Sequence, residues 1–362
     1  MSEALILGAG LGGLLCGSLL ARNGFHVTVL EQGRQPGGAL QSFVREGIRF
    51  DTGFHSVGGL GPGEPLERVF KPLGLLSLPW VRTEEDEVVT EGRSCPLSAC
   101  PEGAFLRLNG GGALEMEHVI GPYLQSTWRL RGGGKVLADA LAGDIRLRGG
   151  AVLCGKRAVS IAGGCVSCAD GSRYEAPVIV SSLHPVRTMD LVRDPVRPSY
   201  RRTLASYTDG PGVFSVQIKL KPGAIPFVNH AVFLEKTVMI HFGEADPDGF
   251  SRSLDLLRFA PAAIPDRDAL ARETIAFAAQ RIPALPAAVE RYWTSTPSTW
   301  ERFTGTPGGS AYGPVKADDS AFLPARTPVP GLYLTGQGIG LHGVLGVAMA
   351  ALQTCEEISK HL

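Results

Sequence analysis

Residues 4–31 read ALILGAGLGGLLCGSLLARNGFHVTVLE. The first four residues are apolar and are followed by glycine, which predicts a short buried strand over 4–7. Leucines then recur at helical spacing up to Asn23-Gly24, a typical helix end, and the run from His26 to Leu30 predicts a second strand. Strand, helix and strand in this order form a nucleotide-binding βαβ unit. We therefore expect an α/β protein with a Rossmann-like domain.

The glycines of this segment have the G-x-G-x-x-G spacing, at Gly8, Gly10 and Gly13. In such a loop the first glycine permits a tight turn, the second lets the backbone approach a pyrophosphate, and the third lets the helix pack on the strand. Free N–H groups at the helix start hold the diphosphate. Glu31 follows Gly8 by 23 residues, close to the roughly 20 expected for a carboxylate that binds a ribose hydroxyl. The segment therefore predicts a dinucleotide site.

A second glycine pair, Gly37-Gly38, follows directly after Pro36 and favours FAD over NAD. A nicotinamide domain has no chemical use for a second close backbone approach at this point, whereas the longer, ribityl-bearing flavin dinucleotide does. Downstream, residues 50–55 predict a buried turn that contains an imidazole. We interpret His55 either as a hydrogen-bonded structural histidine or as a group beside the isoalloxazine ring.

The composition restricts the class of protein. The 362 residues include 47 glycines, nearly twice the average share of about 7%, and each glycine costs conformational entropy on folding. Apolar residues make up 44%, which is enough to fill a core and excludes a disordered chain. Because 35 basic residues balance 35 acidic ones, no electrostatic attraction to nucleic acid is expected. The length suggests about two domains.

The cysteines and two long uncharged stretches bear on where in the cell the protein is located. Seven cysteines, an odd number, fit a reducing compartment, so we expect a cytoplasmic protein. Cys165 and Cys168 would face opposite sides of a strand, which argues against a redox or metal pair, and no metal site is expected. Residues 4–21 and 327–355 are long enough to span a bilayer, but glycine clusters interrupt both. The first stretch also lacks the basic leader of a secretory signal.

The run from Gly8 to Gly59 resembles the phytoene desaturase, carotenoid isomerase and retinol saturase group of flavoproteins. The resemblance rests on the glycine motif, Glu31, residues 36–38, Ser42 and residues 50–55. Many members carry arginine directly after the second glycine pair, and Ala39 stands there in this chain, closer to the saturase branch.

This resemblance implies non-covalently bound FAD in a domain of the glutathione-reductase and amine-oxidase type, with a substrate domain of mixed β-sheet and helices. It implies that the following residues bind the cofactor: Gly8, Gly10, Leu11, Gly12, Gly13, Glu31, Gln32, Gly37, Gly38, Ala39, Leu40, Ala158, Gly336, Gln337, Gly343 and Val344. It divides the chain into a discontinuous FAD-binding domain (1–75, 126–195 and 310–362) and a substrate domain (76–125 and 196–309).

The middle of the chain contains further element signals. A glycine run over 132–134 precedes a predicted helix, and short strands between 151 and 182 resemble the family's β-ribbon, in which Ala158 would contact adenine. The substrate domain is predicted to contain strands over 213–220, 231–234 and 238–242 and a helix over 266–281. We expect the acidic run 84–87 to be a solvated loop. The basic cluster Arg193, Arg197, Arg201 and Arg202 is interpreted as a solvated helix end or as a contact for a membrane surface or an acidic electron donor.

The C-terminal segment repeats the glycine spacing at Gly338, Gly340 and Gly343, after a predicted strand over 331–335. Only 19 residues remain after Gly343, too few for a second nucleotide unit. We instead expect a helix over 344–358 whose N-terminus points at the flavin, where the positive end of its dipole favours negative charge. Many such flavoproteins place an aspartate in this loop, and Gln337 offers no carboxylate. His342 is interpreted either as a group in the chemistry or as one that orients the loop.

The expected activity is hydride transfer at a carbon–carbon bond of an apolar substrate of polyene, carotenoid, retinoid or isoprenoid type, as desaturase, saturase or isomerase. His55 and His342 are the candidate proton shuttles, and NAD(P)H is a candidate transient reductant.

Two alternatives stay open, an amine oxidase-like or hydroxylating flavoenzyme and a non-catalytic flavin-binding protein. An amine oxidase needs an aromatic cage, for which Trp293, Tyr312 and Tyr333 have no obvious placement. Relatives usually carry a larger helical insertion before the middle motifs than this chain has. The sequence does not specify the oligomeric state.

Overall fold

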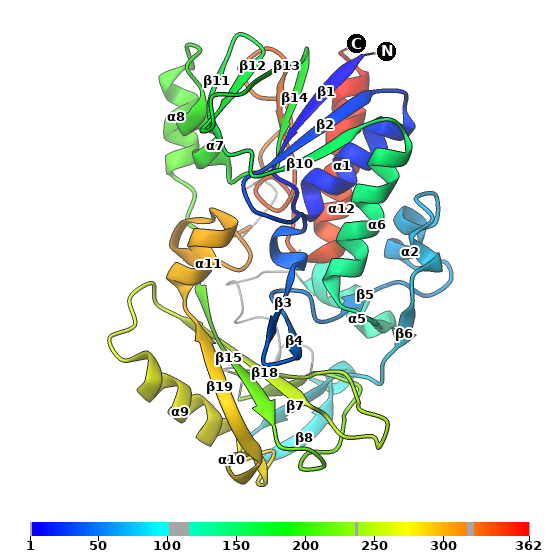
Figure 1. Ribbon diagram of the computed structural model, residues 1–362, viewed down its shortest axis with the longest axis vertical. Helices are drawn as coiled ribbons and strands as arrows, with labels where there is room; N and C mark the ends of the chain where they lie inside the picture. The colour runs from blue at the N-terminus through cyan, green and yellow to red at the C-terminus, as the bar shows by residue number, and fades with distance from the viewer. Residues whose placement is uncertain (1, 101–115, 236–237, 317–321, 362) are drawn as a thin grey trace.

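The computed structural model describes residues 2–100, 116–235, 238–316 and 322–361. Figure 1 shows two halves, an upper one that carries both chain ends and a lower one built on a large twisted sheet. Segments from the start, middle and end of the chain come together in the upper half. The fold class is the predicted one, a Rossmann-like α/β domain with a second region of mixed sheet and helices.

The upper half is built on a parallel sheet with strand order β10-β2-β1-β14-β20. Its strands are β1 (Glu3–Leu7), β2 (His26–Glu31), β10 (Ala151–Cys154), β14 (Val178–Ser181) and β20 (Leu332–Leu334). One face, with Ile6 and Val29, packs against α1 (Leu11–Arg22), α6 (Gly134–Leu147) and α12 (Gly343–Ser359). Both faces are covered, as parallel strands require, so the strands are mostly apolar. The predicted βαβ unit, the helix after 134 and the C-terminal strand and helix are confirmed.

The other face of this sheet, with Leu5 and Leu7, packs against a small ribbon and two helices. These elements are β11 (Ala158–Ala162), β12 (Cys165–Cys168), β13 (Arg173–Glu175), α7 (Pro185–Leu191) and α8 (Pro198–Ala205). Cys165 and Cys168 lie on β12, and Cys168 is buried while Cys165 is half-buried, as strand alternation predicts. The strands over 151–154 and 178–181 are not part of the ribbon, because the first pairs with β2 and the second with β1 and β20 in the parallel sheet.

The lower half is a seven-stranded sheet of order β19-β15-β18-β17-β16-β7-β8. Its strands are β7 (Glu87–Thr90), β8 (Arg93–Pro96), β15 (Gly212–Leu220), β16 (Val232–Leu234), β17 (Val238–Phe242), β18 (Ser253–Ala260) and β19 (Val289–Ser295). Even-numbered side chains of its four central strands, such as Val216 and Leu256, pack against α9 (Arg267–Ala278) and α10 (Leu285–Ala288). Odd-numbered side chains therefore lie on the opposite face, toward the upper half.

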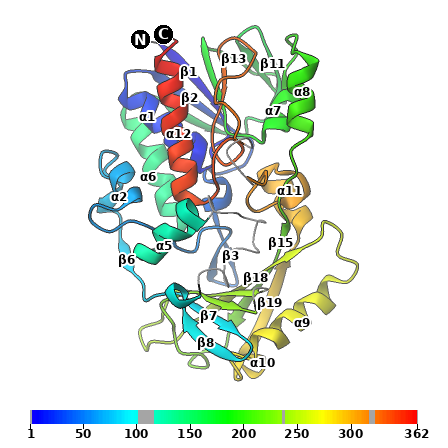
Figure 2. The same cartoon turned by 180° about the vertical axis from the view of Figure 1, so that it is seen from behind.

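Shorter elements connect the two halves. They are β3 (Ser42–Arg45), β4 (Ile48–Asp51), β5 (Val57–Gly58), β6 (Trp80–Arg82), β9 (Thr127–Leu130), α2 (Pro65–Phe70), α5 (Gly121–Gln125), α11 (Pro297–Thr304), a π-helical turn (Met116–Ile120) and 3₁₀ turns at Gly38–Leu40, Leu75–Ser77, Leu97–Ala99 and Pro307–Gly309. Figure 2 shows α12 running from the end of the molecule that carries both termini to its middle. No helix in the described ranges combines the length and apolarity needed to cross a membrane.

The acidic run over 84–87 is a solvated loop only in its first half. Glu84 and Glu85 are exposed, but Asp86 is 1% exposed and accepts a hydrogen bond from the Ala231 N–H at 2.9 Å. Glu87 opens β7 and forms a bidentate ion pair with Arg281, with N–O distances of 2.7 and 2.8 Å. The prediction was wrong for these two residues because their partners lie far along the chain. Within the predicted substrate-domain segment 76–125, residues 101–115 lie outside the described residues.

Candidate functional site

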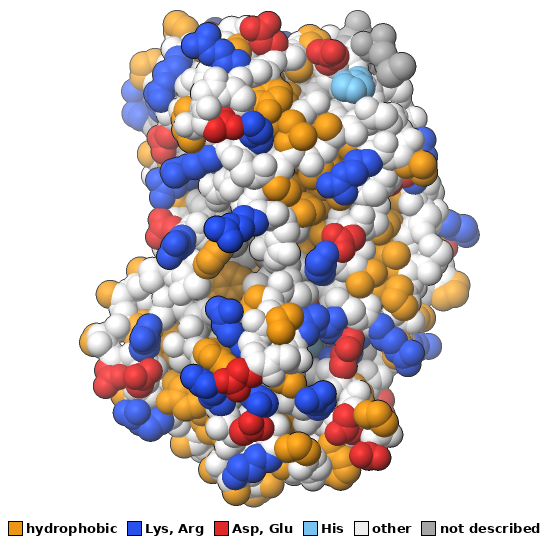
Figure 3. Space-filling model, in the orientation of Figure 1, with side chains coloured by type: hydrophobic (Ala, Val, Ile, Leu, Met, Phe, Trp, Pro, Cys, Tyr) orange, Lys and Arg blue, Asp and Glu red, His pale blue; other side chains and the backbone are white. Residues whose placement is uncertain are grey.

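A cavity of about 890 Å³ lies between the two halves. It is lined by the loops that follow the parallel strands on one side and by the large sheet on the other. Figure 3 shows the surface hollowed between the upper and lower halves, with hydrophobic side chains at the bottom of the hollow. The carboxyl ends of parallel strands are where α/β folds bind ligands.

The N-terminus of α1 opens on this cavity. Gly10 is its N-cap and provides no side-chain cap, so the N–H groups of the first turn point outward for a ligand. A Cβ on Gly10 would meet nothing within 4 Å in the protein, which leaves this backbone open to the cavity. A Cβ on Gly13 would instead lie 2.1 Å from the Gly8 carbonyl, so this glycine is needed where helix meets strand. Gly8, Leu11 and Gly12 also lie around this turn, and of the motif only Gly13 does not line the cavity.

Glu31 closes the same loop from the end of β2. Its carboxylate accepts hydrogen bonds from the Ala9 N–H at 2.8 Å and the Gly33 N–H at 2.6 Å, and it is 8% exposed. Each carboxylate oxygen can accept a second bond, which suits ribose hydroxyls. Glu31 and Gln32 both line the cavity.

The second glycine pair lies directly against the first loop. The Gly37 N–H donates to the Ala9 carbonyl at 2.7 Å, and a Cβ on Gly38 would lie 3.1 Å from the Gly10 Cα. Gly37 and Gly38 have φ of 130° and 55°, in the region that favours glycine. Ala39 and Leu40 continue along the cavity wall. The two glycine-rich segments thus lie side by side and present one continuous backbone surface to the cavity.

The C-terminal loop completes this side of the cavity. A Cβ on Gly12 would lie 3.0 Å from the Gly336 Cα, so the two chain ends meet backbone to backbone. The first turn of α12 supplies Gly343 and Val344 to the lining, next to Gly336 and Gln337. At the far end, Ala158 of the ribbon lines the cavity beside Lys156 and Arg157. Apart from Gly13, every predicted cofactor residue therefore lies on this one cavity.

His342 is the N-cap of α12 and does not line the cavity itself, but it packs against a residue that does. It is 7% exposed, and its ring centroid is 4.2 Å from that of Tyr312, which does line the cavity. Tyr312 also contacts Phe259, with ring centroids 6.2 Å apart. Trp293 packs against Phe50, and Tyr333 is buried in the core of the upper half. The three aromatic residues considered for an amine oxidase cage are thus dispersed.

The opposite wall is the odd-numbered face of the large sheet. Val213, Phe233, Met239, Leu257 and Phe259 contribute apolar side chains to it, from four neighbouring strands. The alternation seen in the sequence of β15 places this face toward the cavity and the even-numbered one against α9.

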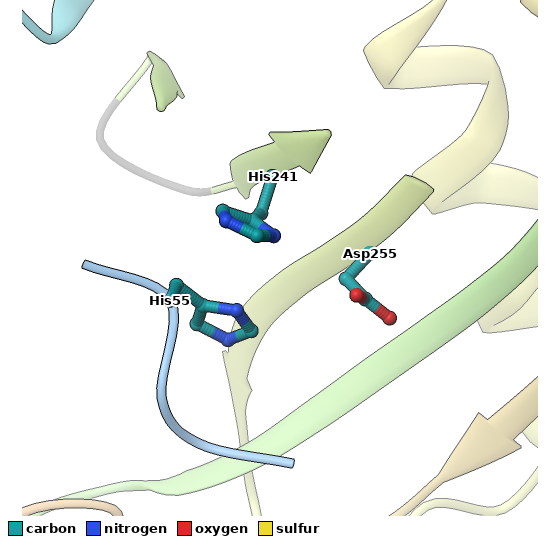
Figure 4. A group of neighbouring side chains, drawn as sticks. All are labelled: His55, His241 and Asp255. Carbon is teal, nitrogen blue, oxygen red and sulfur yellow. The ribbon is translucent and has the colours of Figure 1, made fainter. Parts of the chain in front are cut away.

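Deeper on the same face, polar side chains replace the apolar ones. Asp255 of β18 lies directly opposite His241 of β17 on one side and Gln217 of β15 on the other. All three are at most 5% exposed. His55, from the turn after β4, stacks beside His241 with ring centroids 4.5 Å apart (Figure 4) and also lines the cavity.

Burial determines the protonation of this cluster. It lowers the pKa of His55 to about 4, with the charge of Arg129 as the second cause, and it lowers the pKa of His241 well below its ordinary value. Burial, and then the charge of Asp51, raises the pKa of Asp255 well above its usual range. These shifts favour the neutral form of both imidazoles and of the carboxyl.

Sequence reasoning selected His55 and missed His241, Asp255 and Gln217. The signal was present, because each of these three is a polar residue at an odd position of a strand whose even positions are mostly apolar. Which odd positions lie opposite one another depends on the cross-strand register, and no local pattern specifies it.

Comparisons with known proteins agree with this geometry. The model of an NAD(P)-binding Rossmann-like domain matches residues 6–73. The all-trans-retinol 13,14-reductase of Danio rerio is 37% identical over 78 residues, 22% of this chain and 13% of the relative. The phytoene desaturase of Cercospora nicotianae is 48% identical over 50 residues, 14% of this chain and 8% of the relative. The resemblance to the retinol saturase and phytoene desaturase group is confirmed. It covers only a small part of these relatives' lengths.

Solved structures share the fold over the whole chain. An oxidoreductase from Methanosarcina mazei superposes with a TM-score of 0.75 at 18% identity, covering 98% of this chain and all of that one. A triple mutant of putrescine oxidase superposes with a TM-score of 0.71 at 14% identity, covering 100% of this chain and 99% of that one. The Rossmann-like fold with a second, mixed region is thereby shown.

Proposed function

We propose that this chain is an FAD-dependent oxidoreductase that acts on a carbon–carbon bond of an apolar substrate, of the polyene or isoprenoid kind. The observation that carries the proposal is the shared cavity. Backbone from both ends of the chain forms one wall, and an apolar sheet face forms the other. The likeness to retinol reductases and phytoene desaturases supports the substrate class. We propose an FAD-binding domain of residues 1–75, 126–195 and 310–362 and a substrate domain of 76–125 and 196–309, of which α8 packs on the sheet of the first.

The residues present fit FAD. Gly10 leaves open space beside an uncapped helix start, which suits a diphosphate. Glu31 suits a ribose, and the loop of Gly336 and Gln337 leads to the N-terminus of α12. When bound, FAD supplies two-electron hydride chemistry. The positive end of the α12 dipole would stabilise negative charge on a reduced flavin. The loop itself has no carboxylate, since Gln337 stands where many such flavoproteins have aspartate.

The chain's own residues would orient the substrate and exclude water. Phe233, Met239 and Leu257 offer only apolar contacts, so an extended hydrocarbon can lie along them. Because burial keeps the His55 imidazole neutral, its Nδ1 or Nε2 can accept a proton but cannot donate one as an imidazolium at neutral pH. His342 would act through Tyr312 as a positioning residue for this loop.

The amine oxidase alternative requires a group that binds a cationic amine on the substrate side. The carboxylates that line the cavity are Glu31, Asp190 and Glu301. Glu31 holds the first glycine loop, and Glu301 forms an ion pair with Arg187 at 3.0 Å. The sheet wall itself carries no carboxylate among the described lining residues. These features favour an apolar substrate.

Purification tests the cofactor part of the proposal. We expect a yellow protein that releases FAD on denaturation, with about one FAD per chain by absorbance, or an apoprotein that becomes yellow when FAD is added. Protein that stays colourless with added FAD would refute the flavoenzyme and favour a role without flavin.

A further inference from the structure

We propose that His55, His241 and Asp255 bind one divalent first-row transition metal ion. The three residues offer two imidazole nitrogens and a carboxylate oxygen, one atom each, all within 4.8 Å of one another. Figure 4 shows them approaching from a turn and from two neighbouring strands. The site uses none of the residues proposed to hold FAD, but it shares His55 with the proposed flavin chemistry, and a bound ion would make this side chain a ligand in place of a proton acceptor.

The first argument is that these polar atoms are buried without partners. Within the described part of the chain, both ring nitrogens of His55 and Oδ1 of Asp255 have no hydrogen-bond partner, and the His241 ring has no side-chain partner and only a weak contact with the His55 backbone. Gln217 Oε1, beside Asp255 in the sheet, is also buried without a hydrogen-bond partner. Leaving a buried polar atom unsatisfied costs about 1–3 kcal/mol, so several together point to a missing ligand.

The second argument is geometric. Zinc lies about 2.0–2.2 Å from nitrogen and oxygen ligands in tetrahedral geometry, so two ligand atoms of one ion are about 3.3–3.6 Å apart. The ligand atoms here lie within 4.8 Å of one another, so side-chain rotation must bring any pair closer by at most about 1.5 Å. His241 and Asp255 are fixed opposite each other by the sheet register. His55 comes from the upper half, so an ion would link the two halves of the molecule.

The third argument concerns the type of ion. Imidazole suits zinc, iron, copper and nickel, whereas calcium and magnesium prefer oxygen ligands throughout. Arg129 adds a positive charge nearby, but Asp51 and Glu244 lie close enough to oppose it. Since His55 lines the cavity, a coordination position left open by three protein ligands would lie close to the substrate wall.

Metal analysis tests this proposal. The full-length protein is purified without chelator, its metal content is measured by inductively coupled plasma mass spectrometry, and the chelator-stripped protein is titrated with Zn²⁺ by calorimetry. We expect about one ion per chain. Each of the variants His55→Gln, His241→Gln and Asp255→Asn should weaken Zn²⁺ binding by more than the 10–100-fold typical of outer-shell changes. The matched control is His361→Gln, which removes an exposed histidine that contacts Glu357 and should bind Zn²⁺ like the wild type.

Two results would overturn the proposal. One is wild-type protein that binds no Zn²⁺, Fe²⁺ or Co²⁺ at this stoichiometry. The other is Zn²⁺ binding that survives in the His55→Gln variant, whose substitution lies in a turn and whose fold is checked by circular dichroism. Thermal unfolding gives a second readout, because an ion that binds only the folded state raises the melting temperature. Zn²⁺ should raise it in the wild type and not in Asp255→Asn.

Discussion

Gly10 and Gly13 belong to one motif but are glycines for different reasons. Gly13 meets protein, since a Cβ there would lie 2.1 Å from the Gly8 carbonyl, whereas Gly10 meets only the open cavity. A side chain at Gly13 would thus disturb the fold, and one at Gly10 would disturb only a ligand. The sequence motif predicted both glycines, but only the structure separates these two roles.

The Gly10→Ala variant separates folding from cofactor binding. We expect normal folding, because its φ of −73° suits alanine and no protein atom is within 4 Å. FAD binding should weaken about tenfold or more, as one methyl in a close contact costs roughly 1–3 kcal/mol. Fluorescence titration of apoprotein with FAD measures this. The control is Gly143→Ala, at an exposed position of α6 that also has no neighbours within 4 Å, and this variant should bind FAD normally. Equal affinity in both variants would place the diphosphate elsewhere.

Asp86 makes stability depend on pH. Burial raises its pKa from 3.8 to about 6, so between these values the unfolded chain loses this proton while the folded one keeps it. Its contribution to stability is therefore full below about pH 4 and is lost as the pH rises through about 6. The Asp86→Asn variant does not lose stability in this way, because asparagine does not ionise, and its side-chain oxygen can still accept the hydrogen bond from the Ala231 N–H. Urea unfolding should show the variant gaining about 1–3 kcal/mol relative to the wild type over this interval. A difference that does not change with pH would contradict the assignment.

At the scale of elements, the large sheet has two faces with different tasks. On β18, Leu256 is fully buried against α9, whereas Leu257 is half-buried and lines the cavity. Local alternation in the sequence was enough to predict β15, and short, mostly apolar runs predicted β16 and β17. It did not predict the polar cluster, because that cluster depends on register between β17 and β18.

Neighbouring leucines on β18 test this division. Leu256→Ala should lower the free energy of unfolding by about 2–5 kcal/mol, as expected for a fully buried leucine. Leu257→Ala should cost less stability and weaken the binding of an apolar polyene, measured by quenching of flavin fluorescence. The same loss of polyene affinity in both variants would show that the cavity wall is not the binding surface.

At the scale of the whole molecule, the cavity exists because distant segments meet. Short-range signals identified the loops at 8–13, 37–38 and 336–344, since each carries its own glycines and its own strand or helix. The contact of Gly12 with Gly336 and the ion pair of Glu87 with Arg281 join residues far apart along the chain, and no local pattern contains them. The family resemblance implied that the two ends of the chain lie close together, as Gly12 and Gly336 do, because both ends would hold one FAD. Nothing in the sequence indicated the ion pair of Glu87 with Arg281.

The most direct test of the account is anaerobic redox of the FAD-loaded protein with matched substrates. The protein is reduced with dithionite and offered a conjugated polyene, and separately the oxidised protein is offered a more saturated isoprenoid or a diamine such as putrescine, while flavin absorbance is followed. We predict that one of the two apolar arms changes the flavin redox state, with the product changed by two hydrogens, and that the diamine has no effect. Bleaching of the oxidised flavin by the diamine, with no change in either apolar arm, would contradict the account.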